Sequence, residues 1–292
     1  MSETDSAAHT QVELLGAAHI RQLASALGVV PTKKLGQNFV IDPNTVRRIA
    51  TEAHLQADDV VVEIGPGLGS LTLAMLPRVK QVVAVEIDRV LAVQLPITVA
   101  KHAPTLAENL SVINADAMTV TELGQVPTKL VANLPYNISV PVVLHFLEQF
   151  PSIAEVLVMV QAEVADRMAA GPGSRTYGVP SAKLAWYGNV TKAGNVGRNV
   201  FWPAPNVDSG LVRIIRHGQS PDESLRAKTF AVIDSAFGQR RKTIRSALGA
   251  ALGTTAQVET VLSAAGIDSG LRGEQLSLDD FLAIARAAIQ VG

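Results

Sequence analysis

The segment Asn133-Leu134-Pro135-Tyr136 follows a short apolar run and carries the most specific chemical signal in the chain. The side-chain oxygen of Asn133 and the backbone carbonyl of Leu134 are two acceptors that can bind both protons of an amine and orient its lone pair. Pro135 restricts the turn that presents them, and Tyr136 offers a ring for stacking. A proline turn with a buried tyrosine is the plainer interpretation, and the motifs described next weigh against it.

The same segment resembles the (Asn/Asp)-Pro-Pro-Tyr motif of amino-methyltransferases, which act on exocyclic amines of nucleic-acid bases. This resemblance implies that Asn133 and Leu134 bind the N6 protons of an extruded adenine. Phe201 is a second candidate aromatic, because nearby prolines stiffen its loop and could press its ring against the other face of the base. Ordinary packing is the alternative for this phenylalanine.

A glycine-rich turn follows the apolar residues 60–64 and precedes a helical pattern. Its glycines, Gly65, Gly67 and Gly69, let a ligand approach the backbone closely. The spacing is G-x-G-x-G, and Pro66 removes a backbone N–H that a pyrophosphate would need. The turn therefore predicts a nucleotide-like ligand and disfavours a dinucleotide.

Acidic residues stand at the ends of the next two predicted strands. Glu86 lies 21 residues after Gly65, where a carboxylate can accept both ribose hydroxyls. Asp116 follows the third strand and can accept a hydrogen bond from an adenine amine, although a helix cap is the competing interpretation. An adenosine with a non-phosphate tail satisfies these groups, and S-adenosylmethionine is the expected cofactor.

The arrangement of apolar runs predicts an α/β fold. The expected strands are residues 60–64, 82–85, 110–113, 129–132 and 156–160, a segment around 190, and 211–215. Short β-branched runs alternating with amphipathic helices are typical of a doubly wound parallel sheet. We expect a tail and leading helix in residues 1–30, a seven-stranded Rossmann-like class I methyltransferase domain in 31–217, and a small all-α domain in 218–292 that binds RNA or the ribosome.

Composition narrows the function further. The chain has 292 residues, 48% of them hydrophobic, with no cysteine, which excludes disulfides and thiolate zinc sites. It contains no apolar run of about 20 residues, so a cytoplasmic protein is expected, without a membrane partner. The net charge of −1 means that any nucleic-acid surface depends on local clusters of basic residues. The candidate RNA-binding residues are Lys33, Lys34, Arg240, Arg241, Lys242 and Arg245.

Nearly the whole chain resembles the ribosomal RNA adenine dimethyltransferase family. The matching motifs are residues 33–40 (KKLGQNFV), 63–67 (EIGPG), 85–88 (VEID), 114–117 (NADA), 133–139 (NLPYNIS), 161–167 (QAEVADR), 201–205 (FWPAP) and 237–243 (FGQRRKT). The resemblance implies dimethylation at N6 of two neighbouring adenosines near the 3′ end of 16S rRNA, within an immature small ribosomal subunit. The implied cofactor contacts, with their neighbours, are Gln37, Asn38, Val40, Gly65, Gly67, Glu86, Ile87, Asp116, Ala117 and Asn133.

Three alternatives stay open at this point. A resistance-type methyltransferase of large-subunit rRNA shares the mechanism but typically has Ile where Leu134 stands. A ribosome-assembly factor with dispensable catalysis is opposed by the intact motif from Asn133 to Tyr136. A nicotinamide dehydrogenase is disfavoured by Pro66 and ranks last. We expect a monomer, because the substrate particle itself supplies a large binding surface.

Overall fold

The computed structural model describes residues 12–29, 37–135, 138–219 and 221–291. Several sequence-based predictions lie outside these residues: the first part of the N-terminal tail, the basic residues Lys33 and Lys34, and the stacking tyrosine Tyr136. The leading helix is confirmed. It spans Ala17–Ala26, which is shorter than the helix that the spacing of apolar residues predicts.

The predicted α/β sheet is confirmed in the described part of the chain. The strands are β1 (Phe39–Val40), β2 (Val60–Ile64), β3 (Gln81–Glu86), β4 (Leu110–Asn114), β5 (Lys129–Asn133), β6 (Glu155–Gln161), β7 (Gly188–Val196), β8 (Phe201–Trp202) and β9 (Ser209–Arg216). Seven form one sheet in the order β4-β3-β2-β5-β6-β9-β7, and β1 pairs with β8 in a separate two-stranded ladder. The pairs from β4 to β6 are parallel, and β2 is buried along its whole length, as expected for a sheet covered on both faces.

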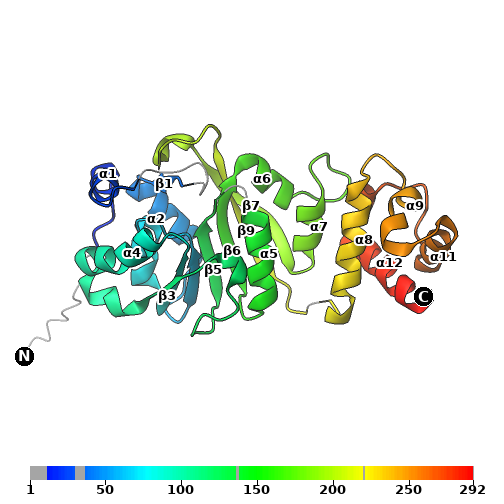
Figure 1. Cartoon of the computed structure of the whole chain (residues 1–292), viewed down its shortest axis with the longest axis horizontal. Helices are drawn as coiled ribbons and strands as arrows, with labels where there is room; N and C mark the ends of the chain where they lie inside the picture. Colours follow the sequence, from blue (N-terminus) through cyan, green and yellow to red (C-terminus); the bar gives the residue numbers. More distant parts are fainter. Residues whose placement is uncertain (1–11, 30–36, 136–137, 220, 292) are drawn as a thin grey trace, which may run out of the picture. The chain divides into compact units, whose positions relative to one another are not determined.

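Helices cover the sheet and form the C-terminal part (Figure 1). They are α1 (Ala17–Ala26), α2 (Pro43–Glu52), α3 (Ser70–Met75), α4 (Arg89–His102), α5 (Ser139–Gln149), α6 (Ala162–Met168), α7 (Val179–Ala185), α8 (Arg226–Gly238), α9 (Ile244–Ala247), α10 (Gly249–Leu252), α11 (Thr255–Ala265) and α12 (Leu278–Val291). Local sequence fixes several helix starts. Asp42 caps α2 and Asp88 caps α4 through side-chain oxygens that accept backbone N–H groups. The capping residue Asp88 lies two residues after Glu86, and α4 begins at the next residue, Arg89.

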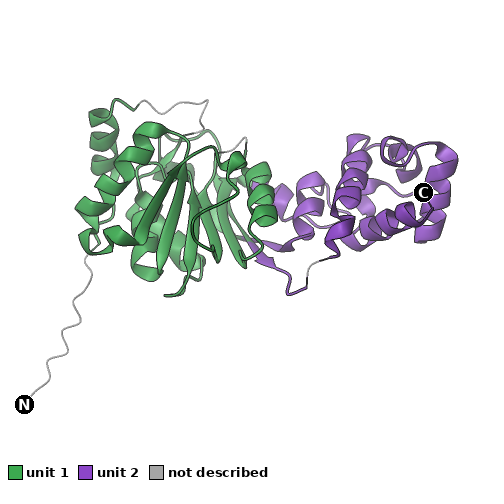
Figure 2. Cartoon of the chain, turned by 60° about the horizontal axis from the view of Figure 1, so that its bottom comes forward, with its two compact units in different colours: residues 1–162, 193–213 green, residues 163–192, 214–292 purple. Residues whose placement is uncertain are grey.

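The described residues pack into two compact units (Figure 2). Unit 1 comprises residues 1–162 and 193–213, and unit 2 comprises 163–192 and 214–292. Unit 2 has its own hydrophobic core, which includes Phe281 and Ile233. Residues 163–192, which the sequence analysis assigned to the methyltransferase domain, thus pack with the C-terminal helices. The functional division near residue 218 stays a prediction.

A buried amine anchors the start of β5. The Nζ atom of Lys129 donates hydrogen bonds to the carbonyl oxygens of Ala53 at 3.1 Å and His54 at 2.6 Å, and to Oε2 of Glu155 at 3.2 Å. It lies 3.5 Å from Oδ2 of Asp59, which is also buried. This network joins β5, β6 and the segment that leads into β2, at the end of the sheet opposite to the strand-end motifs.

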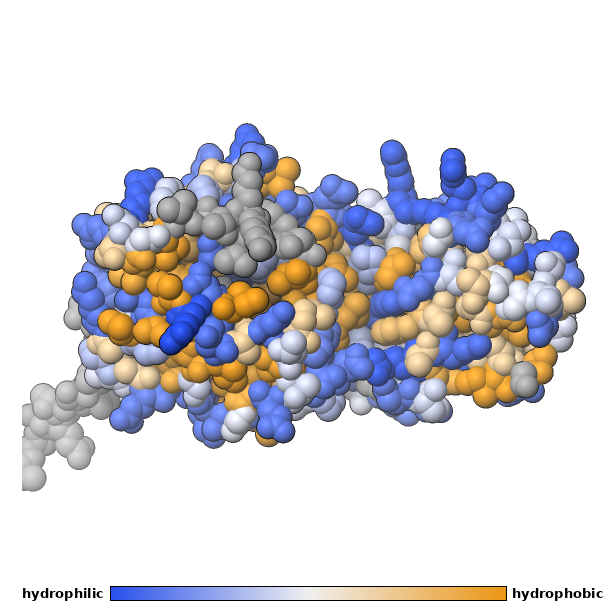
Figure 3. Space-filling view, in the orientation of Figure 1, coloured by the Kyte–Doolittle hydropathy of each residue, from blue (hydrophilic) through white to orange (hydrophobic). Residues whose placement is uncertain are grey.

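Part of the surface of α4 is apolar. Val90, Val93 and Ile97 are 47%, 63% and 57% exposed, and their spacing places them on one helix face. Figure 3 shows apolar side chains at the surface in the part of unit 1 where Figure 1 places α4. No helix among the described residues combines the length and apolar composition that a bilayer crossing requires.

Candidate functional site

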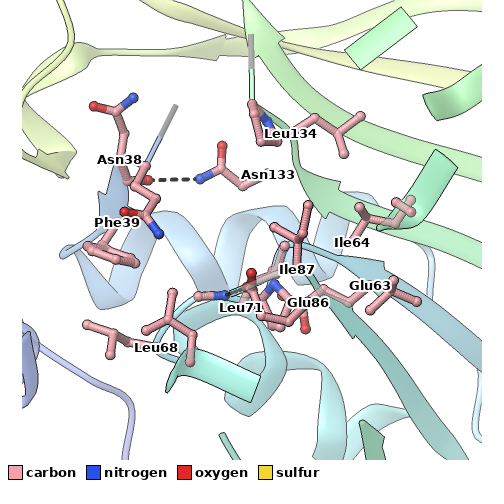
Figure 4. A pocket seen from close by; sticks show the side chains of 18 of the residues that line it. Asn38, Phe39, Glu63, Ile64, Leu68, Leu71, Glu86, Ile87, Asn133 and Leu134 are labelled. Carbon is pink, nitrogen blue, oxygen red and sulfur yellow. Dashed lines mark hydrogen bonds between the residues drawn. The ribbon is translucent and has the colours of Figure 1, made fainter. Parts of the chain in front are cut away.

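A pocket opens beyond the carboxyl ends of β2, β3, β4 and β5 (Figure 4). The described residues that line it are Gln37, Asn38, Phe39, Val40, Glu63, Ile64, Gly65, Pro66, Gly67, Leu68, Ser70, Leu71, Val85, Glu86, Ile87, Leu91, Ala115, Asp116, Ala117, Asn133, Leu134, Pro135 and Ile138. Every residue predicted to contact the cofactor is in this set. The structure therefore brings together side chains and backbone groups from five separate motifs.

The glycine turn shapes one wall of the pocket. Gly65 and Gly67 have φ values of +66° and +59°, a region that L side chains rarely adopt. A Cβ atom on Gly67 would lie 2.9 Å from the Phe39 ring, whereas one on Gly65 would meet nothing within 4 Å. Gly67 thus allows Phe39 to pack closely, and Gly65 leaves the space beside the turn open for a ligand.

Glu86 is held rigidly at the end of β3. The backbone N–H of Gly67 donates to its Oε2 at 3.1 Å, and that of Asp88 donates to its Oε1 at 2.9 Å. The Asn114 amide donates to the Glu86 carbonyl at 2.8 Å, which ties the ends of β3 and β4 together. Burial raises the pKa of the Glu86 carboxyl, while the two backbone hydrogen bonds act to lower it. Each carboxylate oxygen keeps a lone pair that can accept a ribose hydroxyl.

Glu63 is a second acidic residue in the pocket, next to Glu86 in Figure 4. It is 2% exposed, and the Thr72 hydroxyl donates to its Oε2 at 2.6 Å. Burial, with a smaller contribution from the nearby Glu86, raises the pKa of Glu63 to about 8 against the lowering effect of the Thr72 hydrogen bond. In the sequence, Glu63 is recognisable only as the first residue of the glycine motif. Its burial depends on the packing of α3 against β2, which a linear pattern does not reveal.

The segment containing β1 closes the pocket from the other side. The Ser70 hydroxyl donates to the Val40 carbonyl at 2.8 Å, which fixes β1 to the start of α3. The Gln37 amide donates to Oδ2 of Asp88 at 3.4 Å, across the mouth of the pocket. Phe39 and Ser70 are lining residues that the sequence analysis did not identify. The two-residue pairing of β1 with β8 is too short to leave a periodic signal in the sequence.

Asn133 is oriented by a contact with this closing segment. Its Nδ2 donates to the backbone carbonyl of Asn38 at 3.1 Å, the dashed line in Figure 4. A carbonyl can only accept, so this bond fixes which side of the amide is nitrogen and leaves Oδ1 as an acceptor. The backbone N–H of Leu134 donates to the Met159 carbonyl on β6 at 3.0 Å, which holds the following peptide in place. Both residues are held in place by these bonds, and their role as an acceptor pair stays a prediction.

Asp116 fits both interpretations that the sequence left open. Its Oδ1 accepts the backbone N–H of Met118 at 2.9 Å and so caps a short 3-10 helix, Ala117–Thr119. Asp116 also lines the pocket, where Oδ2 can accept from an adenine amine. A cap and a ligand contact are compatible, because a carboxylate has two oxygens.

All the charged side chains among the described lining residues of the pocket are acidic. Its described lining residues include three carboxyl groups, those of Glu63, Glu86 and Asp116, and no Lys, Arg or His. Such a lining suits a ligand with positive charge and is unfavourable for a phosphate group. S-adenosylmethionine meets both conditions, because it carries a sulfonium and no phosphate, and the open space at Gly65 leaves room for it.

Phe201 is the one predicted stacking group that the structure describes, and it does not line the pocket. Phe201 is 3% exposed, pairs with Val40 in the β1–β8 ladder and belongs to the hydrophobic core of unit 1. It is absent from the described lining, so its stacking role stays a prediction that requires the ring to become accessible. Tyr136 lies outside the described residues.

The predicted RNA-binding residues that the structure describes lie in unit 2. Nε of Arg240 lies 2.9 Å from Oε2 of Glu274, and that of Arg245 lies 2.9 Å from Oε1 of Glu259. Arg241 is exposed, as is Lys242 beside it. Contact of these groups with RNA stays a prediction.

Comparisons with known proteins match this architecture. The model of the family described as "Ribosomal RNA adenine dimethylase" matches residues 31–290. "Ribosomal RNA small subunit methyltransferase A" of Thermobifida fusca is 58% identical over 286 residues, which cover 98% of this chain and 99% of the relative. The protein of the same name from Streptomyces avermitilis is 60% identical over 275 residues, 93% of each chain.

Two solved structures extend the likeness to three dimensions. The dimethyladenosine transferase from Plasmodium falciparum has a TM-score of 0.72 at 25% identity and covers 83% of this chain and 94% of its own. The 23S rRNA methyltransferase ErmE has a TM-score of 0.64 at 26% identity and covers 87% of this chain and all of its own. The chain, with its acidic cofactor pocket and its Asn-Leu-Pro-Tyr segment, belongs to the ribosomal RNA adenine dimethylase family.

Proposed function

We propose that this enzyme dimethylates the N6 amine of adenosines in 16S rRNA, with S-adenosylmethionine as methyl donor. The names of its close relatives specify the small ribosomal subunit, and the family description specifies adenine. One observation carries the chemical part of the proposal, namely the hydrogen bond that orients Asn133 beside the acidic pocket.

The acceptor pair explains how the enzyme activates a weak nucleophile. The N6 lone pair of adenine is delocalised into the ring, so it must be turned out of conjugation before it can react. Oδ1 of Asn133 and the Leu134 carbonyl can each accept one N6 proton and hold the amine in that geometry. Because Nδ2 of Asn133 donates one proton to the Asn38 carbonyl, the amide is held in the orientation that leaves Oδ1 available to the amine.

The donor site is formed by the remaining motifs. We assign the ribose hydroxyls to Glu86, the adenine amine of the cofactor to Asp116, and the close backbone approach to Gly65. When bound, S-adenosylmethionine supplies an electrophilic methyl group. Apolar lining residues such as Phe39 exclude water around it.

The finer identity of the substrate is also part of the proposal. We propose that two adjacent adenosines near the 3′ end of 16S rRNA are the targets, within an immature small subunit in the cytoplasm. The exposed Arg241 and Lys242 in unit 2 then contact phosphates, because a planar guanidinium and an ammonium suit that group. We propose that the protein acts as a monomer on this particle.

A second candidate substrate is large-subunit rRNA. The structural likeness to ErmE, a 23S rRNA methyltransferase, favours it. The sequence identities of 58% and 60% to small-subunit enzymes are much higher than the 26% to ErmE, so the small subunit is the preferred assignment. Both candidates use the same chemistry, and only the site of the label distinguishes them.

The test incubates the protein with radiolabelled S-adenosylmethionine and purified, unmethylated small or large ribosomal subunits. Labelled nucleosides are then identified by mass spectrometry, for the wild type, Asn133→Ala and the exposed-site control Asn44→Ala. We expect dimethyladenosine in small-subunit rRNA with the wild type and the control, and a loss of about 10²- to 10³-fold in rate for Asn133→Ala. Label confined to large subunits transfers the assignment to the second candidate. Subunit binding without any label would point to an assembly factor.

A further inference from the structure

Glu63 is the deepest charged group of the pocket and has no basic partner there. Within the described part of the chain, the Thr72 hydroxyl is the one group that donates a hydrogen bond to it, and no described lining residue is Lys, Arg or His. The elements packed around it add one further titratable group, Glu86 at the end of β3, which has the same sign of charge. Asp88 in turn contributes negative charge beside Glu86. An ionised Glu63 would therefore be desolvated without compensation.

The free protein avoids this cost by keeping the group neutral. Burial raises the pKa of Glu63 to about 8, so the carboxyl keeps its proton at neutral pH. This situation changes when a cation enters the same pocket. A positive charge a few ångströms from a buried carboxyl favours its ionised form strongly, because little water screens the pair.

We propose that Glu63 is the counter-charge of the methyl donor: it is protonated in the free enzyme and loses its proton to solvent when S-adenosylmethionine binds. The inference rests on the proposed function, since it requires that this pocket holds the cationic donor. It also assigns a specificity role to Glu63. The demethylated product, S-adenosylhomocysteine, has a neutral thioether in place of the sulfonium, so it induces less ionisation and is bound less tightly.

The sign of the pH dependence follows from proton linkage. Because donor binding releases a proton, the affinity for S-adenosylmethionine increases with pH below about 8, by up to tenfold per pH unit, and levels off above it. The affinity for S-adenosylhomocysteine changes less over the same range. The preference for donor over product therefore increases between pH 6 and pH 8.

Isothermal titration calorimetry at pH 7 tests the proposal without any rRNA. The heat of binding is measured in two buffers of different ionisation enthalpy, for each ligand in turn, and the difference gives the number of protons released. We expect nearly one proton for S-adenosylmethionine and clearly fewer for S-adenosylhomocysteine. Glu63→Gln should release no proton with either ligand. The control Glu122→Gln, which replaces an exposed carboxyl in a loop, should release as many protons as the wild type. Equal release with both ligands, or release that persists in Glu63→Gln, overturns the proposal.

A second variant shifts the pH at which the affinity for S-adenosylmethionine rises, without removing the Glu63 carboxyl. The Thr72 hydrogen bond lowers the pKa of Glu63, so Thr72→Val should raise it and shift the rise in donor affinity to higher pH. An unchanged pH profile in this variant contradicts the assignment. If the wild type fails to bind S-adenosylmethionine at all, the proposed function fails. Binding without proton release overturns only the role of Glu63.

The folded state of the ligand-free protein supplies an independent check. An unfolded chain loses the Glu63 proton near the ordinary value of 4.5, whereas the folded protein keeps it up to about pH 8. The folded state therefore binds more protons across this interval, and its stability falls as pH rises. Urea denaturation at pH 5 and pH 8 should show a smaller decrease for Glu63→Gln, whose amide oxygen can still accept from Thr72. Equal decreases for the two proteins count against a protonated Glu63.

Discussion

Replacing Glu86 with glutamine isolates the contribution of a single carboxylate oxygen and charge. In the native protein both oxygens are used by the backbone, Oε2 by the Gly67 N–H at 3.1 Å and Oε1 by the Asp88 N–H at 2.9 Å. A glutamine has one oxygen and one NH2 group, and an NH2 group cannot accept a hydrogen bond. One of the two backbone donors thus loses its acceptor, and so does one ribose hydroxyl of the cofactor.

The size of the effect follows from these lost contacts. A hydrogen bond to a charged group contributes about 1.5–3 kcal/mol, and Glu86→Gln weakens two such bonds to ribose, one of them completely. A net loss of about 2–4 kcal/mol corresponds to a Kd for S-adenosylmethionine that increases by about 30- to 1,000-fold. The methyl-transfer rate at saturating cofactor should change much less, because Asn133 and Leu134 are not altered.

Calorimetric titration with S-adenosylmethionine measures the Kd directly, and urea denaturation shows whether the variant is folded. The matched control is again Glu122→Gln, which removes an equal charge from an exposed loop. A Kd for Glu86→Gln within threefold of the wild type would refute the assignment of Glu86 to the ribose. A large fall in rate at saturating cofactor, with normal affinity, would place Glu86 in the chemical step instead.

Three further changes have expected outcomes. Gly67→Ala should lower the free energy of unfolding by about 1–3 kcal/mol, because φ is +59° and the new Cβ lies 2.9 Å from the Phe39 ring. Lys129→Met should cost about 3–5 kcal/mol in urea denaturation, because the buried Asp59 loses its cationic partner, whereas Glu155 keeps Arg213 at 3.2 Å. Arg241→Glu should weaken binding to small subunits and lower the slope of log affinity against log salt by about 1, with unchanged affinity for S-adenosylmethionine.

Matched controls separate these effects from general damage. Gly171→Ala adds a Cβ that meets nothing within 4 Å, and Lys80→Met and Arg21→Glu alter exposed residues of unit 1. All three should stay near the wild type. A Gly67→Ala protein with wild-type stability would show that the Phe39 ring can move away from the new Cβ at little cost. A loss of unfolding free energy below about 1 kcal/mol for Lys129→Met would mean that water solvates the carboxylates that lose the lysine. Subunit binding by Arg241→Glu with the wild-type salt slope would place the RNA contact elsewhere.

The sequence predicts the positions of the strands well, because the buried strands of the parallel part, such as β2, need continuous apolar runs, although the complete sheet is mixed and not parallel throughout. All seven expected strands of the main sheet are present, and the glycine turn and Glu86 meet at one edge as their positions after β2 and β3 require. A chain-long set of motifs also gave the correct family. Local chemistry thus explains both the fold and the position of the cofactor site.

Features that depend on long-range packing could not be predicted. The ladder of β1 and β8, in which Phe201 pairs with Val40, is only two residues long on each strand. It is too short to show an alternation of apolar and polar residues in the sequence. The raised pKa of Glu63 depends on how completely α3 and the neighbouring strands exclude water from its carboxyl. The grouping of residues 163–192 with unit 2 depends on contacts with helices that follow much later in the chain.

The strand order divides the pocket into two halves, and each half is formed by a different continuous part of the chain. From β2 the chain proceeds outward through β3 to β4, and it then returns to add β5 and β6 on the opposite side. Groups assigned to the cofactor, such as Glu86 and Asp116, lie at or after the ends of β3 and β4. Asn133 and Leu134, by contrast, lie at and after the end of β5. Substitutions that redirect the acceptor can therefore accumulate after β5 while the donor half is unchanged.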